Sequence, residues 1–398
     1  MFLTIPQPVL FVLSKLEKAG FPAYLVGGCV RDEVLGISPH DYDVTTSARP
    51  DEIKRVFAKQ PLILAGEKHG TVAVILRKNT IVEVTAFRVD GDYADGRHPN
   101  EVVFTRDLHA DLSRRDFSIN AMAWRTQEGL VDPFGGQTDC KNGLIRCVGE
   151  PEKRLTEDAL RILRALRFAA RLDFSVEPET ASALHKLKDR LSLVSRERVS
   201  AEISGLLMGQ FAAPILREYG DVLRAAMPEL SEKAPSERAL TALERLETRT
   251  ERLLFAALLM DETPATAEAA LRGLKCPKAL IKDVTLLLTH FAPQIQPSDV
   301  RPLLHALNTE LFDDLVTLCA ADGQNVQPLR KEKARVLSGK LCWTLKGMHL
   351  HGKDLTALGY SGAAIGQELE RLLHLVMTDG LANEKEALLK QAKLDKGE

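Results

Sequence analysis

The sequence predicts an α+β protein in which a mixed head of about 150 residues precedes an all-helical remainder. Up to about Gly149, short β-rich runs interrupt the chain, and two of them, at 71–76 and 81–89, are separated by four residues as in a hairpin. From Thr156 onward, apolar residues recur at helical spacing almost to the end. Prolines divide this part into short helices rather than a coiled coil, at Pro178, Pro228, Pro264, Pro277, Pro293 and Pro302.

A chain of 398 residues has room for two or more packed modules. We expect a head at 1–149, a helical neck at 150–215, a helical body at 216–335 and a helical tail at 336–398. The net charge of −2 gives no overall attraction to nucleic acid, so any such contact needs local basic surfaces. Two basic stretches, for which solvated helix faces are the alternative, contain Arg146, Lys153, Arg154, Arg161, Arg164, Arg167 and Arg171, and Arg330, Lys331, Lys333, Arg335, Lys340 and Lys346.

The first motif follows the apolar run Tyr24–Val26, which predicts a buried strand entering a turn. Gly27 and Gly28 suit that turn, because residues without a Cβ let backbone N–H groups approach an anion closely. The residues 30–35 can open a helix whose N-terminus favours negative charge. The segment therefore predicts a phosphate cradle, with a triphosphate as the obvious anion.

A pair of carboxylates follows at Asp41 and Asp43. On an extended segment their side chains project from the same face, while Tyr42 points the other way. Mg²⁺ prefers oxygen ligands and takes one or two protein carboxylates beside water and substrate phosphates. A glycine turn or an Asp-x-Asp cap alone is ordinary. The order of strand, glycine turn, basic helix start and carboxylate pair instead predicts two-metal phosphoryl transfer.

The stretch Gly27–Asp32, with Leu35, Gly36 and then Asp41–Asp43, resembles the first motif of the class II tRNA nucleotidyltransferases. This family includes the CCA-adding enzymes and the bacterial poly(A) polymerases. The resemblance implies a polymerase-β-like nucleotidyltransferase head with a mixed or antiparallel sheet, followed by a helical neck, body and tail. The residues that it assigns are Asp41 and Asp43 as catalytic ligands of Mg²⁺, and Gly28 and Arg31 as nucleotide-binding residues.

A third acidic residue lies in the second strand of the predicted hairpin. Alternation puts Glu83 on one face with Thr85 and Phe87, and apolar residues on the other. From the residues alone, Glu83 is an edge-strand carboxylate that faces water. Because the segment 82–88 resembles the part of the family that supplies the third acidic residue of the centre, the resemblance implies a catalytic role for Glu83.

Two arginines and an aspartate precede an apolar turn in Ser113–Ala121. Arginine forks suit phosphate oxygens, and Asp or Asn side chains can bind ribose hydroxyls. The segment resembles the family's second motif, which implies nucleotide-binding roles for Arg114, Asp116 and Asn120. Asp132–Gly136 resembles the third motif, thought to couple head and neck, and here we expect a structural turn.

The most diagnostic later stretch is Glu157–Arg164. Helical projection from a cap at Thr156 puts Glu157, Asp158 and Arg161 on one face, opposite an apolar stripe. The ordinary interpretation is a helix start rich in acid and an i,i+4 ion pair from Glu157 to Arg161. An Asp and Arg pair can also recognise the Watson–Crick edge of cytosine or adenine, since Asp accepts from an exocyclic amine and Arg donates to a ring nitrogen or carbonyl.

This stretch resembles the family's protein-template motif, which selects CTP and ATP over other nucleotides. The resemblance implies that Glu157, Asp158 and Arg161 bind the nucleotide, and that Arg164 adds a phosphate contact or orients the pair. Ser195–Arg198 with Glu202 resembles the fifth motif, which supports the nucleotide-selecting helix.

Two segments favour the CCA-adding members of the family. Gly66–Thr71 resembles their Lys-His-Gly-Thr segment, and Arg88–Pro99 resembles a loop present in enzymes that complete the CCA end. We therefore expect addition of C, C and A to the tRNA 3′ end from CTP and ATP, with release of pyrophosphate and no nucleic-acid template. The alternatives are a bacterial poly(A) polymerase, a partial enzyme that adds only CC or A, and more remotely a catalytically silent RNA-binding protein.

The six cysteines form no Cys-x-x-Cys pair, so reduced thiols in a cytoplasmic protein are the simplest account. The N-terminus lacks a basic segment before a long apolar run, and no stretch of about 18 apolar residues occurs. We expect a cytoplasmic enzyme without membrane association, whose partners are tRNA, CTP and ATP. The sequence implies no protein partner.

Overall fold

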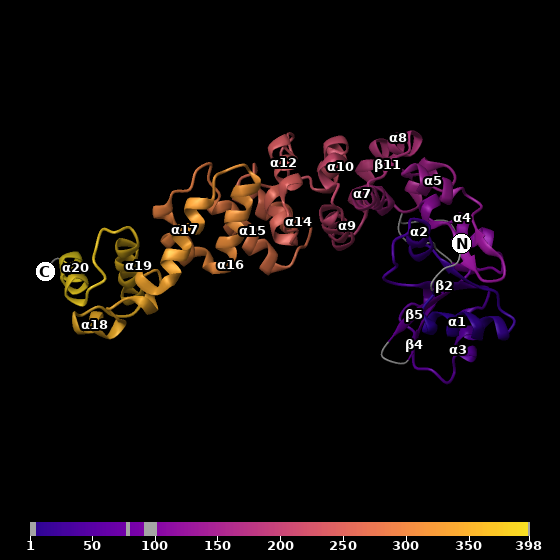
Figure 1. Ribbon diagram of the computed structural model, residues 1–398, viewed down its shortest axis with the longest axis horizontal. Helices are drawn as coiled ribbons and strands as arrows, with labels where there is room; N and C mark the ends of the chain where they lie inside the picture. The colour runs from indigo at the N-terminus through magenta and orange to yellow at the C-terminus, as the bar shows by residue number, and fades with distance from the viewer. Residues whose placement is uncertain (1–4, 77–79, 91–101, 397–398) are drawn as a thin grey trace. The chain divides into compact units, whose positions relative to one another are not determined.

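The computed structural model describes residues 5–76, 80–90 and 102–396 (Figure 1). The chain forms two compact units, Met1–Pro228 and Glu229–Glu398. The first contains a mixed sheet and a set of helices, and the described part of the second consists of helices and their connections. The predicted α+β class is confirmed. The four-part division at 149, 215 and 335 stays a prediction.

A seven-stranded sheet forms the centre of the head. Its order is β3 (Leu62–Ile63), β4 (Thr71–Ile75), β5 (Ile81–Ala86), β2 (Asp43–Thr46), β1 (Ala23–Val26), β8 (Ala123–Arg125) and β9 (Gly129–Val131). Neighbours are antiparallel, except that β2 and β5 are parallel. The β4–β5 hairpin is as predicted. Because β5 lies inside the sheet, the interpretation of Glu83 as an edge-strand residue is wrong.

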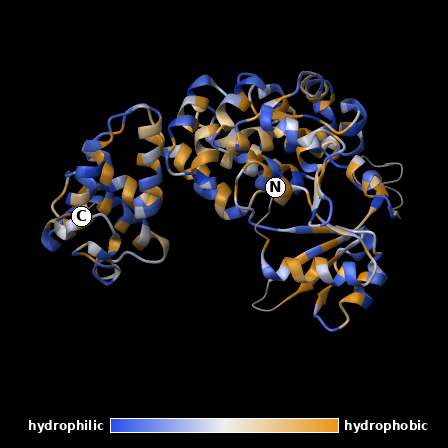
Figure 2. Ribbon diagram, turned by 45° about the vertical axis from the view of Figure 1, so that its right-hand side comes forward, coloured by the Kyte–Doolittle hydropathy of each residue, from blue (hydrophilic) through white to orange (hydrophobic). Residues whose placement is uncertain are grey.

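One face of this sheet is covered by α1 (Gln7–Lys18) and α3 (Pro50–Val56), which pack together against β1, β4 and β5. Along β5, Val82, Val84 and Ala86 are buried, while Glu83 is exposed. This alternation leaves one face of the strand for the core and the other for polar residues. Figure 2 shows the hydrophobic residues of the strands in orange.

The head also contains several short elements. They are the helices α2 (Gly28–Val34), α4 (Leu108–Ser113) and α5 (Gly136–Asn142), the 3₁₀ turns η1 (Glu67–His69) and η3 (Ser118–Asn120), the antiparallel pair β6 (Arg88–Asp90) and β7 (Val102–Phe104), and the parallel pair β10 (Leu144–Ile145) and β11 (Ser175–Val176). The predicted loop Arg88–Pro99 lies mostly outside the described residues, because 91–101 are not described.

Helices complete the first unit: α6 (Pro151–Glu157), α7 (Leu160–Leu172), α8 (Pro178–Leu187), α9 (Arg196–Met208), α10 (Ala212–Glu218) and α11 (Gly220–Ala226), with the turn η4 (Lys188–Leu193). The predicted apolar stripe of α7, which includes Ile162 and Leu166, is buried. No single helix among the described residues has the length and apolar composition to cross a membrane, and only α9 with α10, a pair bent by 119°, passes that test together.

The second unit contains nine further α-helices within its described residues, and Figure 2 shows hydrophilic and hydrophobic residues alternating along them. They are α12 (Glu237–Arg245), α13 (Glu251–Leu258), α14 (Pro264–Gly273), α15 (Lys278–His290), α16 (Val300–Ala321), α17 (Gln327–Arg335), α18 (Gly352–Ala357), α19 (Ala363–Met377) and α20 (Lys385–Lys396). Its last helices enclose a core of their own around Leu350, Leu372 and Leu388.

A close approach of two backbones fixes the turn η3 beneath α5. A Cβ on Gly136 would stand 2.3 Å from the carbonyl oxygen of Ser118 and 2.8 Å from Cγ of Met122, so only glycine fits. Asp132 caps the same helix, because its carboxylate accepts from the backbone N–H groups of Gly136 and Gln137 at 2.7 and 2.8 Å. The structure thus agrees with a structural role for Asp132.

We expect Gly136→Ala to destabilise the first unit by about 3 kcal/mol, since the added methyl must displace backbone rather than a mobile side chain. Thermal unfolding monitored by circular dichroism measures the loss. Gln137→Ala, at the exposed next position, is the matched control and should unfold near the wild-type temperature. Equal midpoints for the two variants would contradict the close packing.

Candidate active site

The parallel pairing of β2 with β5 brings the predicted catalytic carboxylates together. Asp43 and Glu83 are directly paired residues in the register, and Asp41 lies two residues before Asp43, where β2 begins. Loss of surrounding water raises the pKa of Asp43, the charges of Glu83 and Asp41 raise it further, and Arg115 opposes them. The carboxylates therefore create a local negative potential, which favours a cation.

Two aspartates of this kind suit a hard cation such as Mg²⁺, whose other ligands are commonly water and substrate phosphates. Within the described residues, no group of three or more His, Cys, Asp or Glu side chains has a geometry that could hold a metal ion.

The glycine turn lies at the end of β1, as predicted. Gly27 has a positive φ of 76°, and a Cβ there would stand 3.2 Å from Nη1 of Arg115. Gly28 opens α2. The turn thus needs glycine both for its backbone conformation and for the approach of an arginine.

Arg31 does not present its guanidinium to solvent. It is buried, with Nη1 donating to Oδ1 of Asn120 at 2.8 Å and Nε and Nη2 donating to Asp32 at 2.9 and 2.6 Å. Asn120 in turn donates to Asp116 at 3.2 Å. Three of the predicted nucleotide-binding residues are therefore joined in one buried chain of hydrogen bonds.

Asp116 extends that chain to α7. Its carboxylate accepts from Nε and Nη2 of Arg164 at 2.9 and 2.6 Å, and from its neighbouring backbone N–H at 2.8 Å. Burial alone would raise the pKa of Asp116, but the charge and hydrogen bonds of Arg164, with Asn120, lower it to about 2. Arg164 also faces Glu202 of α9 at 3.8 Å. Arg164 therefore holds Asp116, and its role toward the nucleotide stays a prediction.

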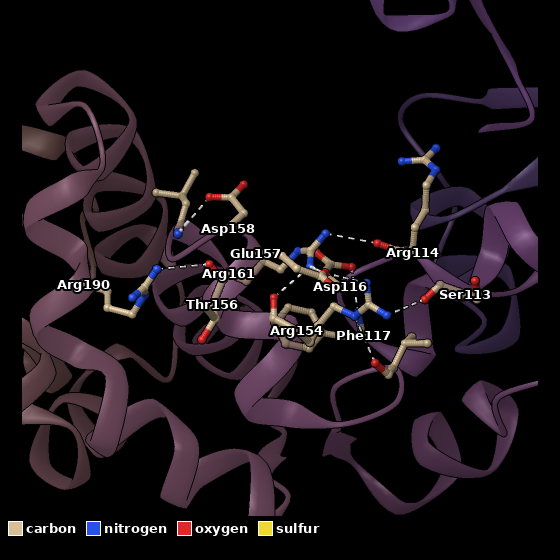
Figure 3. A network of polar contacts seen from close by, with 12 residues as sticks. Ser113, Arg114, Asp116, Phe117, Arg154, Thr156, Glu157, Asp158, Arg161 and Arg190 are labelled. Carbon is tan, nitrogen blue, oxygen red and sulfur yellow. Dashed lines mark hydrogen bonds and ion pairs between the residues drawn. The ribbon is translucent and has the colours of Figure 1, made fainter. Parts of the chain in front are cut away.

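The stretch around Glu157 is not one helix, contrary to expectation. Helix α6 ends at Glu157, Asp158 is extended (φ −141°, ψ 104°), and α7 begins at Leu160, so Thr156 is not a helix cap. Oδ1 of Asp158 instead accepts from the backbone N–H of Leu160 at 3.1 Å (Figure 3). Its Oδ2 accepts from Arg198 at 2.8 Å, so the predicted fifth motif contacts the segment that is predicted to select the nucleotide.

Arg161 lies one turn further along and is 8% exposed. Its Nη1 donates to Glu157 at 2.7 Å and to the carbonyl of Arg154 at 2.8 Å, and its Nη2 donates to the carbonyl of Arg114 at 3.0 Å (Figure 3). The predicted i,i+4 ion pair from Glu157 is therefore present, although it spans the break between the helices.

Two residues in the site were not singled out from the sequence. Asp111, fully buried in α4, accepts from Arg114 at 2.8 and 3.1 Å and from Arg115 at 3.4 Å. The spacing of Asp111 from these arginines, three and four residues on a helix, was the available signal. Arg115 itself lay in the predicted motif, but its approach to Gly27 needs the tertiary structure.

Models of three protein families match the chain. They are the poly A polymerase head domain (residues 23–146), the probable RNA and SrmB-binding site of polymerase A (173–233) and the putative domain 2 of tRNA nucleotidyltransferase (244–392). The CCA-adding enzyme of Geobacillus thermodenitrificans is 36% identical and covers 96% of this chain and 95% of its own. That of Limosilactobacillus fermentum is 35% identical, with 97% and 96% covered.

Solved structures agree with the sequence relatives. The crystal structure of the Bacillus stearothermophilus CCA-adding enzyme in complex with CTP superposes with a TM-score of 0.81, at 32% identity over 98% of both chains. The Thermotoga maritima CCA-adding enzyme complexed with tRNA shares the fold, with a TM-score of 0.68 at 21% identity over 98% of this chain and 96% of that one.

The carboxylate-bearing sheet and the matched head domain define the chain as a nucleotidyltransferase. Since the similarity to the curated relatives extends over nearly the full length of both chains, we can be more specific: the chain belongs to the family of CCA-adding enzymes. The family predicted from the motifs is therefore confirmed. The roles of individual site residues stay predictions.

The depressed pKa of Asp116 predicts a pH-dependent contribution to stability. A lowered carboxyl pKa stabilises the fold above the ordinary value of about 4, and this stabilisation is lost as pH falls toward 2. Asp116→Asn should therefore lower the free energy of unfolding at pH 7 by about 2 kcal/mol, with a difference that shrinks below pH 4. Urea unfolding at a series of pH values measures it.

Asp51→Asn is the control for this measurement, because Asp51 forms an exposed ion pair with Arg55 on α3. Its unfolding free energy should stay close to that of the wild type at every pH. A deficit of Asp116→Asn that is independent of pH would contradict the charged role of Asp116.

Proposed function

We propose that this enzyme completes the CCA end of tRNA, adding C, C and A to the 3′ end from CTP and ATP without a nucleic-acid template. The observation that carries the proposal is the pairing of Asp43 with Glu83 on parallel strands, with Asp41 two residues away. The name of the relatives and the CTP bound to the structure at 32% identity support the choice of reaction and substrate.

Asp41 and Asp43 would hold Mg²⁺, since they provide the oxygen donors and the negative potential that it prefers. When bound, the metal supplies activation of the attacking hydroxyl and charge neutralisation at the leaving group. In the proposed transfer, the 3′ hydroxyl of tRNA forms a bond to the α-phosphorus in line, and the bond to the leaving pyrophosphate breaks. Glu83 adds the third carboxylate beside the pair.

The arginine-rich segment would bind the triphosphate. Arg114 and the glycine turn at Gly28 are proposed to contact the phosphates directly, because guanidinium forks and close backbone N–H groups suit phosphate oxygens. Arg31, Asp116 and Asn120 are buried and bonded to one another. We propose that they act on the nucleotide by fixing this segment, with Arg164 as their link to α7.

Asp158 and Arg161 would choose the base, Asp158 by accepting from the exocyclic amine and Arg161 by donating to the ring. Bonds from Arg198 to Asp158 and from Arg161 to Glu157 support this role, because side chains held in place before binding lose little freedom when the base arrives. Pre-organisation of this kind favours discrimination between bases of similar shape.

The arginines of the first basic stretch are largely bonded within the protein, including Arg154, Arg161 and Arg164. In the second stretch, Arg330 and Lys331 are exposed on α17, while Lys333 pairs with Asp313 and Arg335 with Glu332.

We propose a head at 1–149, a nucleotide-selecting neck at 150–215, a body at 216–335 and a tRNA-binding tail at 336–398, in a cytoplasmic enzyme.

An extension assay tests the function. Transfer RNA lacking its last three nucleotides is offered with CTP, ATP or both, and the products are sized. Addition of C, C and A that then stops supports the proposal. A long A tail would support a poly(A) polymerase. Extension that stops after CC, or after a single A, would support a partial enzyme. No extension would support a silent RNA-binding protein.

In the same assay, Asp41→Ala should abolish incorporation of both nucleotides while tRNA binding persists, because a metal ligand serves the chemical step. A gel-shift titration with tRNA measures binding in parallel. The exposed Asp51→Ala is the control and should extend tRNA normally. Turnover by Asp41→Ala at the wild-type rate would exclude the proposed metal role.

Asp158→Ala should reduce discrimination against UTP and GTP by about 10- to 100-fold, the worth of one good pairing contact. Single-nucleotide incorporation rates for the four nucleotides measure it. Arg190→Gln is the control, because Arg190 bonds the neighbouring Thr156 carbonyl at 3.4 Å without contacting Asp158. Unchanged selectivity in Asp158→Ala would mean that another residue chooses the base.

A further inference from the structure

One buried carboxylate connects most parts of the candidate site. Oδ1 of Asp111 accepts from Nη2 and Nε of Arg114 at 2.8 and 3.1 Å and from the backbone N–H of Arg88 at 3.3 Å. Its Oδ2 accepts from Arg115 at 3.4 Å and from the hydroxyl of Thr45 at 3.3 Å. With a side chain that is 0% exposed, Asp111 exchanges no hydrogen bond with solvent.

The contacts between Asp111 and the two arginines balance buried charges of opposite sign. Arg114 and Arg115 are consecutive, so two guanidinium groups that face one site repel each other unless an anion lies between them. Burying an isolated carboxylate is equally costly. Each charge therefore compensates the other, and the pKa of Asp111, which burial would raise, is held below its ordinary value by Arg114 and Arg115.

The other two contacts reach the strands that carry the acidic residues. Thr45 lies in β2 two positions after Asp43, and its hydroxyl also contacts the carbonyl of Thr85 in β5 at 3.2 Å. Arg88 starts β6, two residues after β5 ends. One side chain is thus bonded both to the arginines and to the strands bearing Asp43 and Glu83.

The orientation of Arg115 shows what this arrangement serves. Its Nη1 lies 3.2 Å from the position that a Cβ on Gly27 would take, directly over the predicted phosphate turn. Its guanidinium therefore lies beside the turn, where its terminal nitrogens suit a phosphate oxygen.

We propose that Asp111 is a positioning residue for the nucleotide triphosphate. It holds Arg114 and Arg115 at a fixed distance from the Asp41 and Asp43 pair, so that bound phosphates lie in a defined position relative to these carboxylates. This inference rests on the proposed nucleotidyl transfer. It assigns Asp111 no contact with the substrate, and it predicts an effect on the triphosphate alone, not on the base or the tRNA.

The test compares the affinities of two ligands that differ only in their phosphates. Equilibrium dissociation constants for CTP and for cytidine 5′-monophosphate are measured with the full chain, in the same buffer with and without Mg²⁺. For Asp111→Asn we expect the CTP constant to rise about tenfold, as for the loss of one charged hydrogen bond, while that for the monophosphate changes less than twofold. A general structural defect would weaken both ligands alike, which would overturn the proposal.

Asp107→Asn is the matched control, because Asp107 is the exposed cap of the same helix and asparagine caps a helix equally well. Its ratio of CTP to monophosphate affinity should equal that of the wild type. A tenfold change in this control would assign the effect to helix α4 as a whole and would also overturn the role of Asp111.

If Asp111→Asn fails to fold, the paired variant Asp111→Asn with Arg114→Gln removes both buried charges together and is compared with Arg114→Gln alone. With Arg114 removed, Asp111 can still act through Arg115, so a further loss confined to CTP, or no further loss, supports the proposal. A further loss of monophosphate affinity of more than twofold contradicts it. Because these are binding measurements, they stand apart from tRNA extension. Wild-type protein that binds CTP but adds nothing to tRNA would refute the proposed function and leave the role of Asp111 intact.

Discussion

Three arginines from α6 and α7 donate to one four-residue segment, Ser113–Asp116, and the arrangement of the site depends on these bonds. Arg154 donates to the carbonyl of Ser113 at 2.7 Å and Arg161 to that of Arg114 (Figure 3). Arg164 donates to the carboxylate of Asp116. A largely buried guanidinium group needs acceptors on every side that lacks water. The helices that carry the predicted base-selecting residues are therefore anchored to the segment that carries Arg114 and Arg115.

This coupling joins the predicted base-selecting residues to the predicted phosphate turn within the first unit. Asp116 receives Arg164 on one side and Asn120 on the other, and Asn120 holds Arg31 behind the glycine turn. Displacement of α7 would break charged hydrogen bonds in a buried region, each of which contributes more than a neutral bond. These bonds therefore oppose movement of α7 away from the glycine turn.

Much of the head could be predicted from local sequence. The glycine turn, the β4–β5 hairpin and the buried stripe of α7 each depend on residues close together in the chain, where spacing determines the outcome. The break at Asp158 could not be predicted, because Glu157–Arg164 has the composition of a continuous helix. Its extended conformation is supported by Arg198, which lies 40 residues away along the chain.

The candidate site shows the same division. Spacing alone placed Asp41 and Asp43 on one segment, whereas the position of Glu83 beside them required the parallel pairing of β2 with β5, which no local pattern encodes. The sequence also could not show whether the basic side chains face solvent or form ion pairs within the protein. A run of arginines looks the same in the sequence whether its side chains face solvent or carboxylates. Here carboxylates that are distant in the sequence, such as Asp116 and Glu202, determine that the arginines form ion pairs within the protein.

The alternation of buried and exposed residues along β5 has a consequence for how the enzyme tolerates change. If β5 slipped by one residue against β2, Val82 and Val84 would turn to the polar face and Glu83 would enter the core, at a cost in both hydrophobic and charge burial. Burial of the apolar residues of β5 therefore fixes the register that places Glu83 opposite Asp43. Substitutions elsewhere in the head are therefore expected to leave Asp43 opposite Glu83 as long as Val82, Val84 and Ala86 stay buried.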